Sequence, residues 1–298
     1  MEQKKVQVLM STYNGQRYVE QQVRSILEQT WKNLELLIRD DGSTDGTVSI
    51  LKRLAEEDSR IRLFLEENVG SNRSFFQLLR MTNADYVSFA DQDDYWLPEK
   101  IERAVEELEN HPDALLYCGN KILTDSELVP LEGAELPNLV PSFEGAIVES
   151  ICTGCTAVFT KRLATMVSEH LPKSAIVHDW WIYMVATYHG EVFFDSNAYM
   201  YYRQHEGNQI GASDSFLGTI KAKKKYLDKS RGKLRAQLQE FKKYNRGRKE
   251  YDALVDDFLL SETDTGVRRK LAFSNRFHRQ NRLDQMVVRA LILLNRFL

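Results

Sequence analysis

The sequence predicts an α/β protein: a mostly parallel, doubly wound sheet followed by a helical C-terminal extension. Two observations favour this fold class. Through the first two thirds of the chain, short apolar segments alternate with segments of helical spacing, and short loops join them, as is typical of parallel sheets. Over residues 216–298 helical spacing continues without strands, and the net charge changes sign. We therefore expect two domains, residues 1–215 and residues 216–298.

The expected elements of the first domain follow one another with few long gaps. The strands are apolar segments bounded by turn residues, at 6–10, 34–38, 61–65, 86–90, 115–118, 156–159, 192–194 and 199–202. The helices carry apolar residues three or four positions apart, at 18–28, 48–57, 71–79 and 99–109, and a further helix opens at 177–181. Residues 124–142 contain three prolines and predict a surface loop.

The net charge of −3 conceals an asymmetry between the two domains. Residues 1–215 hold 19 Lys and Arg against 34 Asp and Glu, a net charge of −15. Residues 216–298 hold 21 against 9, a net charge of +12. A basic extension on an acidic body indicates an anionic partner for the extension. Nucleic acid is the less favoured partner, because the body itself is strongly acidic.

Several function classes are disfavoured by what the sequence lacks. The three cysteines are odd in number, which argues against a disulfide framework and for a reducing compartment. No apolar targeting segment opens the chain and no uncharged run has the length of a membrane span, so we expect a cytoplasmic protein. Neither a Gly-x-Gly-x-x-Gly motif nor a P-loop follows the first strand, which argues against dinucleotide oxidoreductases and P-loop enzymes.

The most informative stretch is an acidic cluster directly after the fourth strand. Asp91, Asp93 and Asp94 lie within four residues and repel one another unless a cation lies among them. Carboxylate oxygens suit Mg²⁺ or Mn²⁺. In open α/β sheets, ligands bind at the carboxyl ends of strands, where these acids are expected. The stretch therefore predicts a metal site; the alternative is an acidic turn that caps the next helix.

Two further acidic positions, Asp40-Asp41 and Asp179, follow apolar segments that we expect to converge on the same sheet edge. An enzyme that uses a nucleotide-diphosphate donor needs hydrogen-bond acceptors for the base and ribose, a cation for the diphosphate and a general base for the attacking hydroxyl. The three acidic positions offer these groups.

Taken in order, these stretches resemble the family 2 inverting glycosyltransferases, which have the GT-A fold, and among them bacterial rhamnosyltransferases of cell-wall and capsular polysaccharide synthesis. The resemblance covers residues 6–212. The stretches that carry it are Met10-Ser11-Thr12-Tyr13-Asn14, Asp40-Asp41-Gly42-Ser43-Thr44-Asp45-Gly46-Thr47, Asp91-Gln92-Asp93-Asp94-Tyr95-Trp96-Leu97-Pro98, Thr153-Gly154, His178-Asp179-Trp180 and Tyr202-Arg203-Gln204-His205.

The resemblance implies a role for each matching residue. The nucleotide-binding residues are Thr12, Tyr13, Asn14, Asp40, Asp41, Asp91 and Arg203, with Arg203 near the phosphates. Asp93 and His205 are the implied ligands of Mn²⁺ or Mg²⁺, and Asp94 supports either the ribose or the metal. For Asp40 and Asp41 the alternative is a helix cap and a turn; for Asp94 it is the cap of the next helix.

For the acceptor side, the resemblance implies that Asp179 is the general base and that Gly154, His178 and Trp180 contact the acceptor. The family often has an acidic residue immediately before this aspartate, whereas this chain has His178, so the role of that position is open. Trp181 is expected either to stack on a sugar or to lie in the core.

The implied reaction is transfer of a sugar, with inversion, from dTDP-rhamnose or else a UDP-hexose to a hydroxyl of a lipid-linked glycan. The alternatives are a catalytically silent nucleotide-sugar binder or assembly subunit and, less favoured, a nucleotidyltransferase. Intact Asp93 and Asp179 favour an enzyme.

The extension contains two features that predict a surface role. A cationic block is formed by Lys221, Lys223, Lys224, Lys225, Lys229, Arg231, Lys233 and Arg235. Residues 283–298 are strongly apolar, and Arg282, Arg289 and Arg296 recur every seven residues. The segment is too short to span a bilayer, so we expect an in-plane amphipathic helix at the inner face of the plasma membrane. The alternative is that these helices pack on the first domain or form a homo-oligomer.

Overall fold

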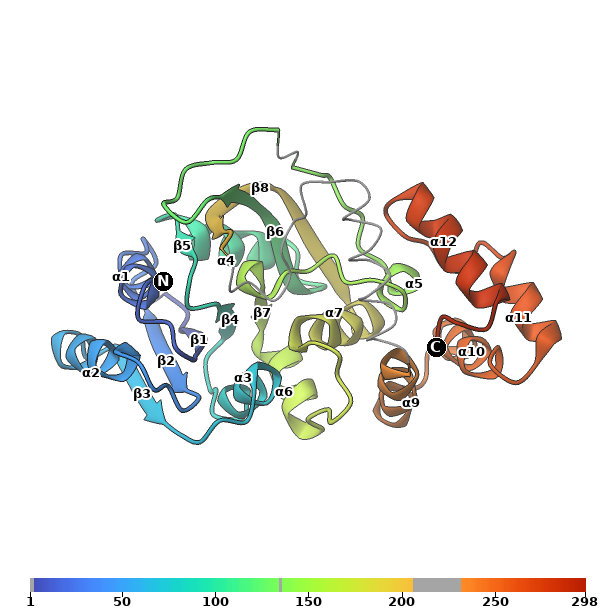
Figure 1. Cartoon of the computed structure of the whole chain (residues 1–298), viewed down its shortest axis with the longest axis horizontal. Helices are drawn as coiled ribbons and strands as arrows, with labels where there is room; N and C mark the ends of the chain where they lie inside the picture. Colours follow the sequence, from blue (N-terminus) through green and yellow to red (C-terminus); the bar gives the residue numbers. More distant parts are fainter. Residues whose placement is uncertain (1–2, 134–135, 206–231) are drawn as a thin grey trace. The chain divides into compact units, whose positions relative to one another are not determined.

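The computed structural model describes residues 3–133, 136–205 and 232–298 (Figure 1). Its contacts divide the chain into two compact units. The first comprises residues 1–138, 152–171 and 190–207, and the second comprises residues 139–151, 172–189 and 208–298. The expected boundary at residue 215, and the lysines from Lys221 to Lys229 with Arg231, lie outside the described residues. Segments 139–151 and 172–189, expected in the first domain, cluster with the C-terminal helices.

The first unit is built on one sheet of eight strands in the order β3-β2-β1-β4-β7-β6-β8-β5. The strands are β1 Val6–Thr12, β2 Leu34–Asp40, β3 Ile61–Leu65, β4 Tyr86–Ala90, β5 Tyr95–Trp96, β6 Ala114–Thr124, β7 Val158–Thr160 and β8 Glu191–Arg203. The neighbours from β3 to β4 are parallel, as are β6 and β8. β7 is antiparallel to β4 and β6, and β5 is antiparallel to β8. The expected mostly parallel α/β sheet is confirmed.

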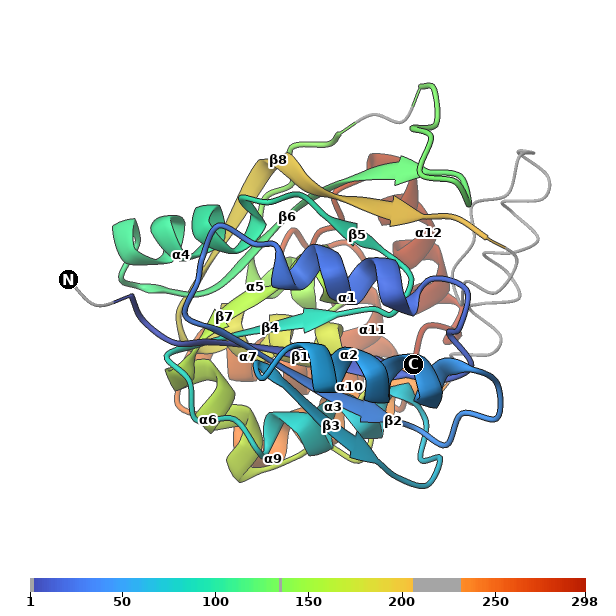
Figure 2. The ribbon, with the colours of Figure 1, turned by 90° about the vertical axis from the view of Figure 1, so that its left-hand side faces the viewer.

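Helices of the first unit cover both faces of this sheet. They are α1 Val19–Leu27, α2 Thr47–Glu57, α3 Ser71–Leu79, α4 Lys100–Asn110 and α6 Lys161–Glu169, with the 3-10 turn η1 Gly154–Thr156. Alternate residues of β1 such as Val8 and Met10 pack with α1, α2 and α4 in one core cluster. Figure 2 shows α1 and α2 in front of the strands. On the opposite face, Phe75 of α3 packs edge-on against Phe89 of β4, with ring centroids 5.1 Å apart.

The second unit is helical over its described residues. Its helices are α5 Phe143–Ala146, α7 His178–His189, α9 Lys233–Tyr244, α10 Lys249–Leu260, α11 Thr265–Ala272 and α12 Arg282–Leu293. Phe143, Tyr188 and Phe241 pack together at the junction of α5, α7 and α9. α7 is buried nearly all round, because ten of its twelve residues are buried. Among the described residues, no helix has the length and apolar character needed to cross a membrane.

Several elements differ from expectation, among them β8, α6 and β5. β8 is a single strand of 13 residues where two short strands were expected. It passes through the polar stretch Asp195-Ser196-Asn197 because Asn120 Nδ2 donates to Ser196 O (2.7 Å) and β-bulges adjust the register with β6. α6 and β5 were not predicted; α6 begins at Thr160, whose hydroxyl accepts the Leu163 N–H.

Candidate active site

The site of the first unit forms where three parallel strands end. In the ladder, Thr12 of β1 lies opposite Asp40 of β2, and Met10 lies opposite Ala90 of β4. The loops that begin at Tyr13, Asp41 and Asp91 therefore start at one edge of the sheet, as expected. The third predicted acidic position, Asp179, belongs to the second unit.

Asp93 and His205, the two predicted metal ligands, lie next to each other. Asp93 Oδ2 and His205 Nε2 are 2.8 Å apart, and both side chains keep about a fifth of their surface exposed. Two neighbouring ligands of an octahedral Mg²⁺, bonded at about 2.1 Å, lie about 3 Å apart. The structure thus brings the two predicted ligands into direct contact through a hydrogen bond, and their binding of a metal stays a prediction. Tyr18 supports His205, with the ring centroids 5.1 Å apart.

Arg203 holds the backbone of the acidic loop. Its Nε donates to Asp93 O (2.8 Å), one terminal nitrogen donates to Gln21 Oε1 (2.7 Å), and the other donates to Ser126 O. Its guanidinium also lies over the Tyr18 ring, 4.3 Å from the centroid. All three nitrogens thus have protein partners, which favours a positioning role. The predicted phosphate contact of Arg203 stays a prediction.

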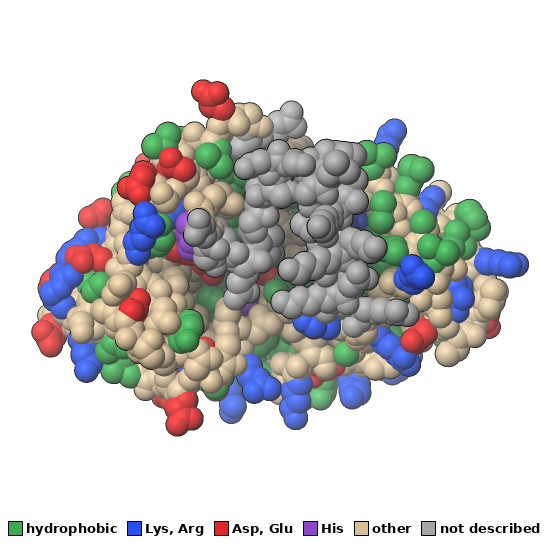
Figure 3. All heavy atoms as spheres, in the orientation of Figure 1, with side chains coloured by type: hydrophobic (Ala, Val, Ile, Leu, Met, Phe, Trp, Pro, Cys, Tyr) green, Lys and Arg blue, Asp and Glu red, His purple; other side chains and the backbone are tan. Residues whose placement is uncertain are grey.

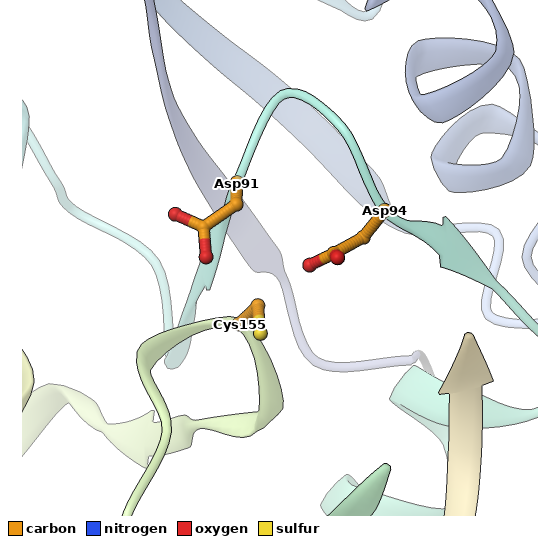
Figure 4. A group of neighbouring side chains, drawn as sticks. All are labelled: Asp91, Asp94 and Cys155. Carbon is orange, nitrogen blue, oxygen red and sulfur yellow. The ribbon is translucent and has the colours of Figure 1, made fainter. Parts of the chain in front are cut away.

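Asp94 lies behind the exposed part of the loop, beside Asp91 and Cys155 (Figure 4). One ligand atom from each of the three residues lies within 4.8 Å of the others. Burial, and then the charges of Asp91 and Asp93, raise the pKa of Asp94 well above its usual range. Burial also raises the pKa of the Cys155 thiol, so the thiol stays protonated and neutral. The neutral thiol forms a hydrogen bond with the Asp94 carboxyl group. Asp94 does not cap the next helix, because α4 has Glu99 at its N-cap.

Lys100 is a buried cation that the sequence reasoning missed. It opens α4, is 3% exposed, and its ammonium lies 3.7 Å from the centroid of the Trp96 ring. Among the described residues its Nζ has no hydrogen-bond partner. Burial lowers its pKa to about 7, although the neighbouring Cys155 and Asp94 act in the opposite direction. Its position four residues after Trp96 in the motif was the available signal.

Asp40 and Asp41 are both buried, and the carboxylate oxygens of both accept hydrogen bonds from other groups of the protein. Asp40 accepts the hydroxyls of Thr12 (2.9 Å) and Ser43 (2.6 Å). Asp41 accepts the backbone N–H groups of Val69 (2.9 Å) and Gly70 (2.8 Å) and pairs with Arg39. These bonds tie the loop after β2 to β1 and to the start of α3. Contact of either carboxylate with a nucleotide base stays a prediction.

The loop after β1 is held in place by Gln92, a second residue that was missed. Gln92 accepts from Tyr13 N (2.8 Å) and donates to Tyr13 O (3.1 Å), as a neighbouring strand would. A Cβ at Gly15 would lie 2.3 Å from Gln92 Oε1, so a larger residue there would displace the Gln92 amide from Tyr13. Asn14 has a positive φ of 49° and accepts Thr44 N at 2.8 Å. The Tyr13 side chain is left about half exposed, beside the acidic loop.

Gly154 lies buried in η1, next to a second cation of the first unit. Lys121 donates to Thr153 Oγ1 (2.6 Å) and lies 4.5 Å from the centroid of the Tyr202 ring. Cys155 lies within this turn and Cys152 precedes it; both are buried and neither forms a disulfide. The acceptor contact of Gly154 stays a prediction; the turn that carries Gly154 is held by the hydrogen bond from Lys121 to Thr153.

In the second unit, Asp179 lies in the first turn of α7, where a helix dipole stabilises a carboxylate. Its Oδ1 accepts Trp180 N (2.6 Å). Burial lowers the pKa of the neighbouring His178, which therefore favours its neutral form. Trp180 is buried and its indole N–H donates to Ala146 O (2.6 Å), while Trp181 lies in the core as one of the two expected alternatives.

Comparison with known proteins places these features in a family context. Residues 7–165 match the model of Glycosyl transferase family 2. Over 97% of its length the chain is 30% identical to the dTDP-rhamnosyl transferase RfbG of Shigella flexneri, and the match covers all of that relative.

Two solved structures share the fold. The S. aureus TarS 1–349 structure in complex with UDP-GlcNAc aligns with a TM-score of 0.62 at 18% identity, covering 98% of this chain and 79% of that one. The mannosyltransferase PcManGT from Pyrobaculum calidifontis, in complex with GDP-Man and Mn²⁺, aligns with a TM-score of 0.61 at 17% identity, covering 91% of this chain and 73% of that one.

Proposed function

This chain belongs to glycosyl transferase family 2 and has the GT-A fold, and on that premise we propose that it is an inverting rhamnosyltransferase. It transfers rhamnose from dTDP-rhamnose to a hydroxyl of a glycan acceptor in bacterial surface polysaccharide synthesis, of the cell wall or the capsule. The observation that carries the proposal is the full-length similarity to a dTDP-rhamnosyl transferase. A UDP-hexose is the second candidate donor.

The first unit supplies the donor side of the proposed reaction. Asp93 and His205 would hold Mn²⁺ or Mg²⁺, which acts as a Lewis acid on the leaving diphosphate. Tyr13 is the half-exposed side chain closest in sequence to the end of β1, and we assign it to the nucleotide base. Thr12, Asn14, Asp40 and Asp41 shape the loops around it, and Asp91 is assigned to the ribose. Arg203 fixes the loop that carries Asp93.

Asp179 is the proposed general base. It removes the proton of the acceptor hydroxyl as the new glycosidic bond forms, and one such carboxylate is sufficient for a single displacement with inversion. A neutral His178 does not compete with the acceptor by forming an ion pair with Asp179. Gly154, His178 and Trp180 remain the proposed acceptor contacts.

We further propose that the acceptor is lipid-linked and that the protein acts as a peripheral protein at the inner face of the plasma membrane. The support is the apolar and basic C-terminal segment, whose composition suits a membrane surface. A lipid-linked acceptor is available only at such a surface. A homo-oligomer built through the same segment is the alternative.

The proposed donor is tested by a screen of dTDP-rhamnose, UDP-glucose, UDP-GlcNAc and GDP-mannose, with released nucleotide diphosphate as the readout. We expect turnover with dTDP-rhamnose and a product whose anomeric configuration is opposite to that of the donor. Turnover of UDP-sugars alone would exclude rhamnose as the transferred sugar. Nucleotide binding without turnover of any donor would instead favour the catalytically silent binder.

A further inference from the structure

The helix α12 carries its apolar residues on both of its faces. At about 100° per residue, its buried residues Val288 and Ile292 define the side that packs on the second unit. The exposed residues lie on the other side, within an arc of about 140°. They are Arg282, Leu283, Met286, Val287, Ala290 and Leu293 of the helix, with Leu294 at its C-cap. The side that faces water is thus almost entirely apolar, the reverse of an ordinary surface helix.

The exposure of this stripe is large. Leu283 is 72% exposed, Met286 66% and Leu294 65%, and Phe273, just after α11, is 73% exposed. Single exposed apolar residues are normal, but a contiguous set marks an interaction site. We name the set Phe273, Leu283, Met286, Val287, Leu293 and Leu294 the apolar stripe. Figure 3 shows hydrophobic side chains gathered over α11 and α12.

Positive charge surrounds the apolar stripe. Residues 265–298 hold eight Lys and Arg and one acidic residue, Asp284, for a net charge of +7. Four of these cations are exposed and form no ion pair within the described part of the chain: Arg269, Lys270, Arg282 and Arg296. In Figure 3 basic side chains border the hydrophobic ones at this end. This surface therefore suits a partner that has an anionic outer layer and an apolar interior below it.

The structure changes which arginines belong to this surface. Arg289 donates to Ser274 O (2.8 Å) and Asn275 Oδ1 (3.1 Å), so it holds the end of α11 and is partly buried. Arg282 and Arg296 are exposed at the two ends of α12. The three arginines spaced seven residues apart therefore do not form one cationic surface, because Arg289 forms hydrogen bonds within the second unit.

We propose that the apolar stripe of α11 and α12 is a docking surface for a bilayer that contains anionic lipid. The apolar side chains enter the region between headgroups and acyl chains, and Arg269, Lys270, Arg282 and Arg296 contact the anionic headgroups. A second copy of this chain fits less well, because a twofold contact would bring two segments of charge +7 together. Nucleic acid would leave the apolar side chains in water.

This inference deepens the proposed function, since a lipid-linked acceptor would then lie at the surface where the protein docks. It does not depend on turnover, so its test uses no donor or acceptor. A failed donor screen and a failed docking test are therefore separate results.

The test is sedimentation of the full chain with phosphatidylcholine vesicles, with and without phosphatidylglycerol, at low and high salt. We expect the wild type to sediment with phosphatidylglycerol vesicles at low salt and to be released in part by high salt. M286E/V287E should lower the vesicle partition coefficient roughly tenfold or more. R269Q/K270Q should lower it by about fivefold for each charge removed, on anionic vesicles only.

The matched control is M81E/V129E, which makes the same charge change at two exposed apolar positions of the first unit. We expect it to sediment like the wild type, and thermal unfolding checks that every variant is folded. The proposal is overturned if the wild type stays in the supernatant with anionic vesicles, or if M286E/V287E and the control lose binding equally. It is also overturned if the wild type is a dimer in solution that M286E/V287E converts to a monomer without any change in vesicle binding.

Discussion

Asp93 and Asp94 are adjacent in the sequence but differ in environment. Asp93 is partly exposed and its carboxylate meets His205, whereas Asp94 is buried and its pKa is raised, first by burial and then by its acidic neighbours. A carboxylate that loses its charge is a poor ligand for a hard cation. Asp93 therefore stays the metal ligand that we propose, with Asp94 as the buried residue behind it.

Replacing Asp93 with Asn keeps the shape of the side chain and removes its charge. We expect turnover to fall by roughly a hundredfold or more, because a bound metal contributes several kcal/mol of charge stabilisation in the transition state. Steady-state kinetics with added Mn²⁺ measure the loss of turnover. Calorimetry of Mn²⁺ binding in the presence of nucleotide measures the loss of metal affinity. Asp113→Asn, the same change in an exposed loop, is the control. Wild-type activity of Asp93→Asn in chelator would remove the metal assignment.

Lys100 predicts a specific pH dependence of stability. Burial lowers its pKa to about 7 from an ordinary value near 10.4, so between these values the unfolded chain binds a proton that the folded chain does not. The free energy of unfolding therefore rises with pH across this window, by at most about 1.4 kcal/mol per unit from this group. Lys100→Met keeps the packing on Trp96 and removes the titration.

The measurement is denaturant unfolding of wild type and Lys100→Met from about pH 7 to about pH 9. We expect the wild type to gain stability relative to the variant as the pH rises. Lys52→Met, at an exposed position of α2, should show no such trend. A stability difference between wild type and Lys100→Met that is independent of pH would contradict the buried, weakly protonated lysine.

At the residue scale, the sequence predicted which loops carry the site but not what each side chain bonds. The partners of Asp41 at Val69 and Gly70 are 28 and 29 residues away, and no local pattern reports a contact over that distance. The sequence shows Gln92 only as part of an acidic motif, whereas in the structure its amide pairs with Tyr13 and lies close to Gly15. These bonds depend on strand register, which the sequence implies only through alternation.

At the scale of elements, the helix α7 carries the proposed base. We expect Asp179→Asn to bind donor normally and to lower turnover by ~10²–10⁴-fold, as for loss of a general base. Loss of an acidic side chain in a first helical turn also costs stability, typically 0.3–1 kcal/mol. Asp284→Asn, the acidic first-turn residue of α12, reproduces that cost without the proposed chemistry.

Turnover and thermal unfolding of the two variants separate the roles. The idea fails if Asp179→Asn keeps the turnover of Asp284→Asn, or if the product retains the anomeric configuration of the donor.

The elements that the sequence predicted well are those with unbroken apolar runs. β1, β2 and β4 are buried along nearly their whole length, so their pattern is strong. β8 was divided because Asp195-Ser196-Asn197 reads as a turn, although Tyr117 donates to Asp195 (3.0 Å) and Asn120 donates to Ser196, which hold the strand in the sheet. The cause is tertiary pairing that overrides a local turn signal.

At the scale of the whole molecule, the chain enters the second unit three times. Segments 139–151 and 172–189 are inserted between parts of the first unit, and both cluster with the helices that follow residue 208. The sequence predicts a separate basic domain at residues 216–298. The core contacts suggest instead that the C-terminal helices complete the burial of α5 and α7.

This arrangement predicts what happens when the chain is cut after residue 215. Phe143, Trp181 and Tyr188 each pack against Phe241 of α9, and Tyr188 also donates to Asp252 of α10 (2.7 Å). The cut removes α9 and α10 and exposes these rings, each of which contributes roughly 3–5 kcal/mol when fully packed.

We therefore expect the chain of residues 1–215 to aggregate, or to lose the near-ultraviolet circular dichroism of its aromatic residues and to be cleaved by protease within 172–189. The comparison is with a chain cut after residue 264, which keeps α9 and α10 and removes the helices of the apolar stripe. That chain should retain a cooperative thermal transition. If residues 1–215 unfold as cooperatively as the full chain, the C-terminal helices are a separable appendage and Asp179 does not depend on them for its position.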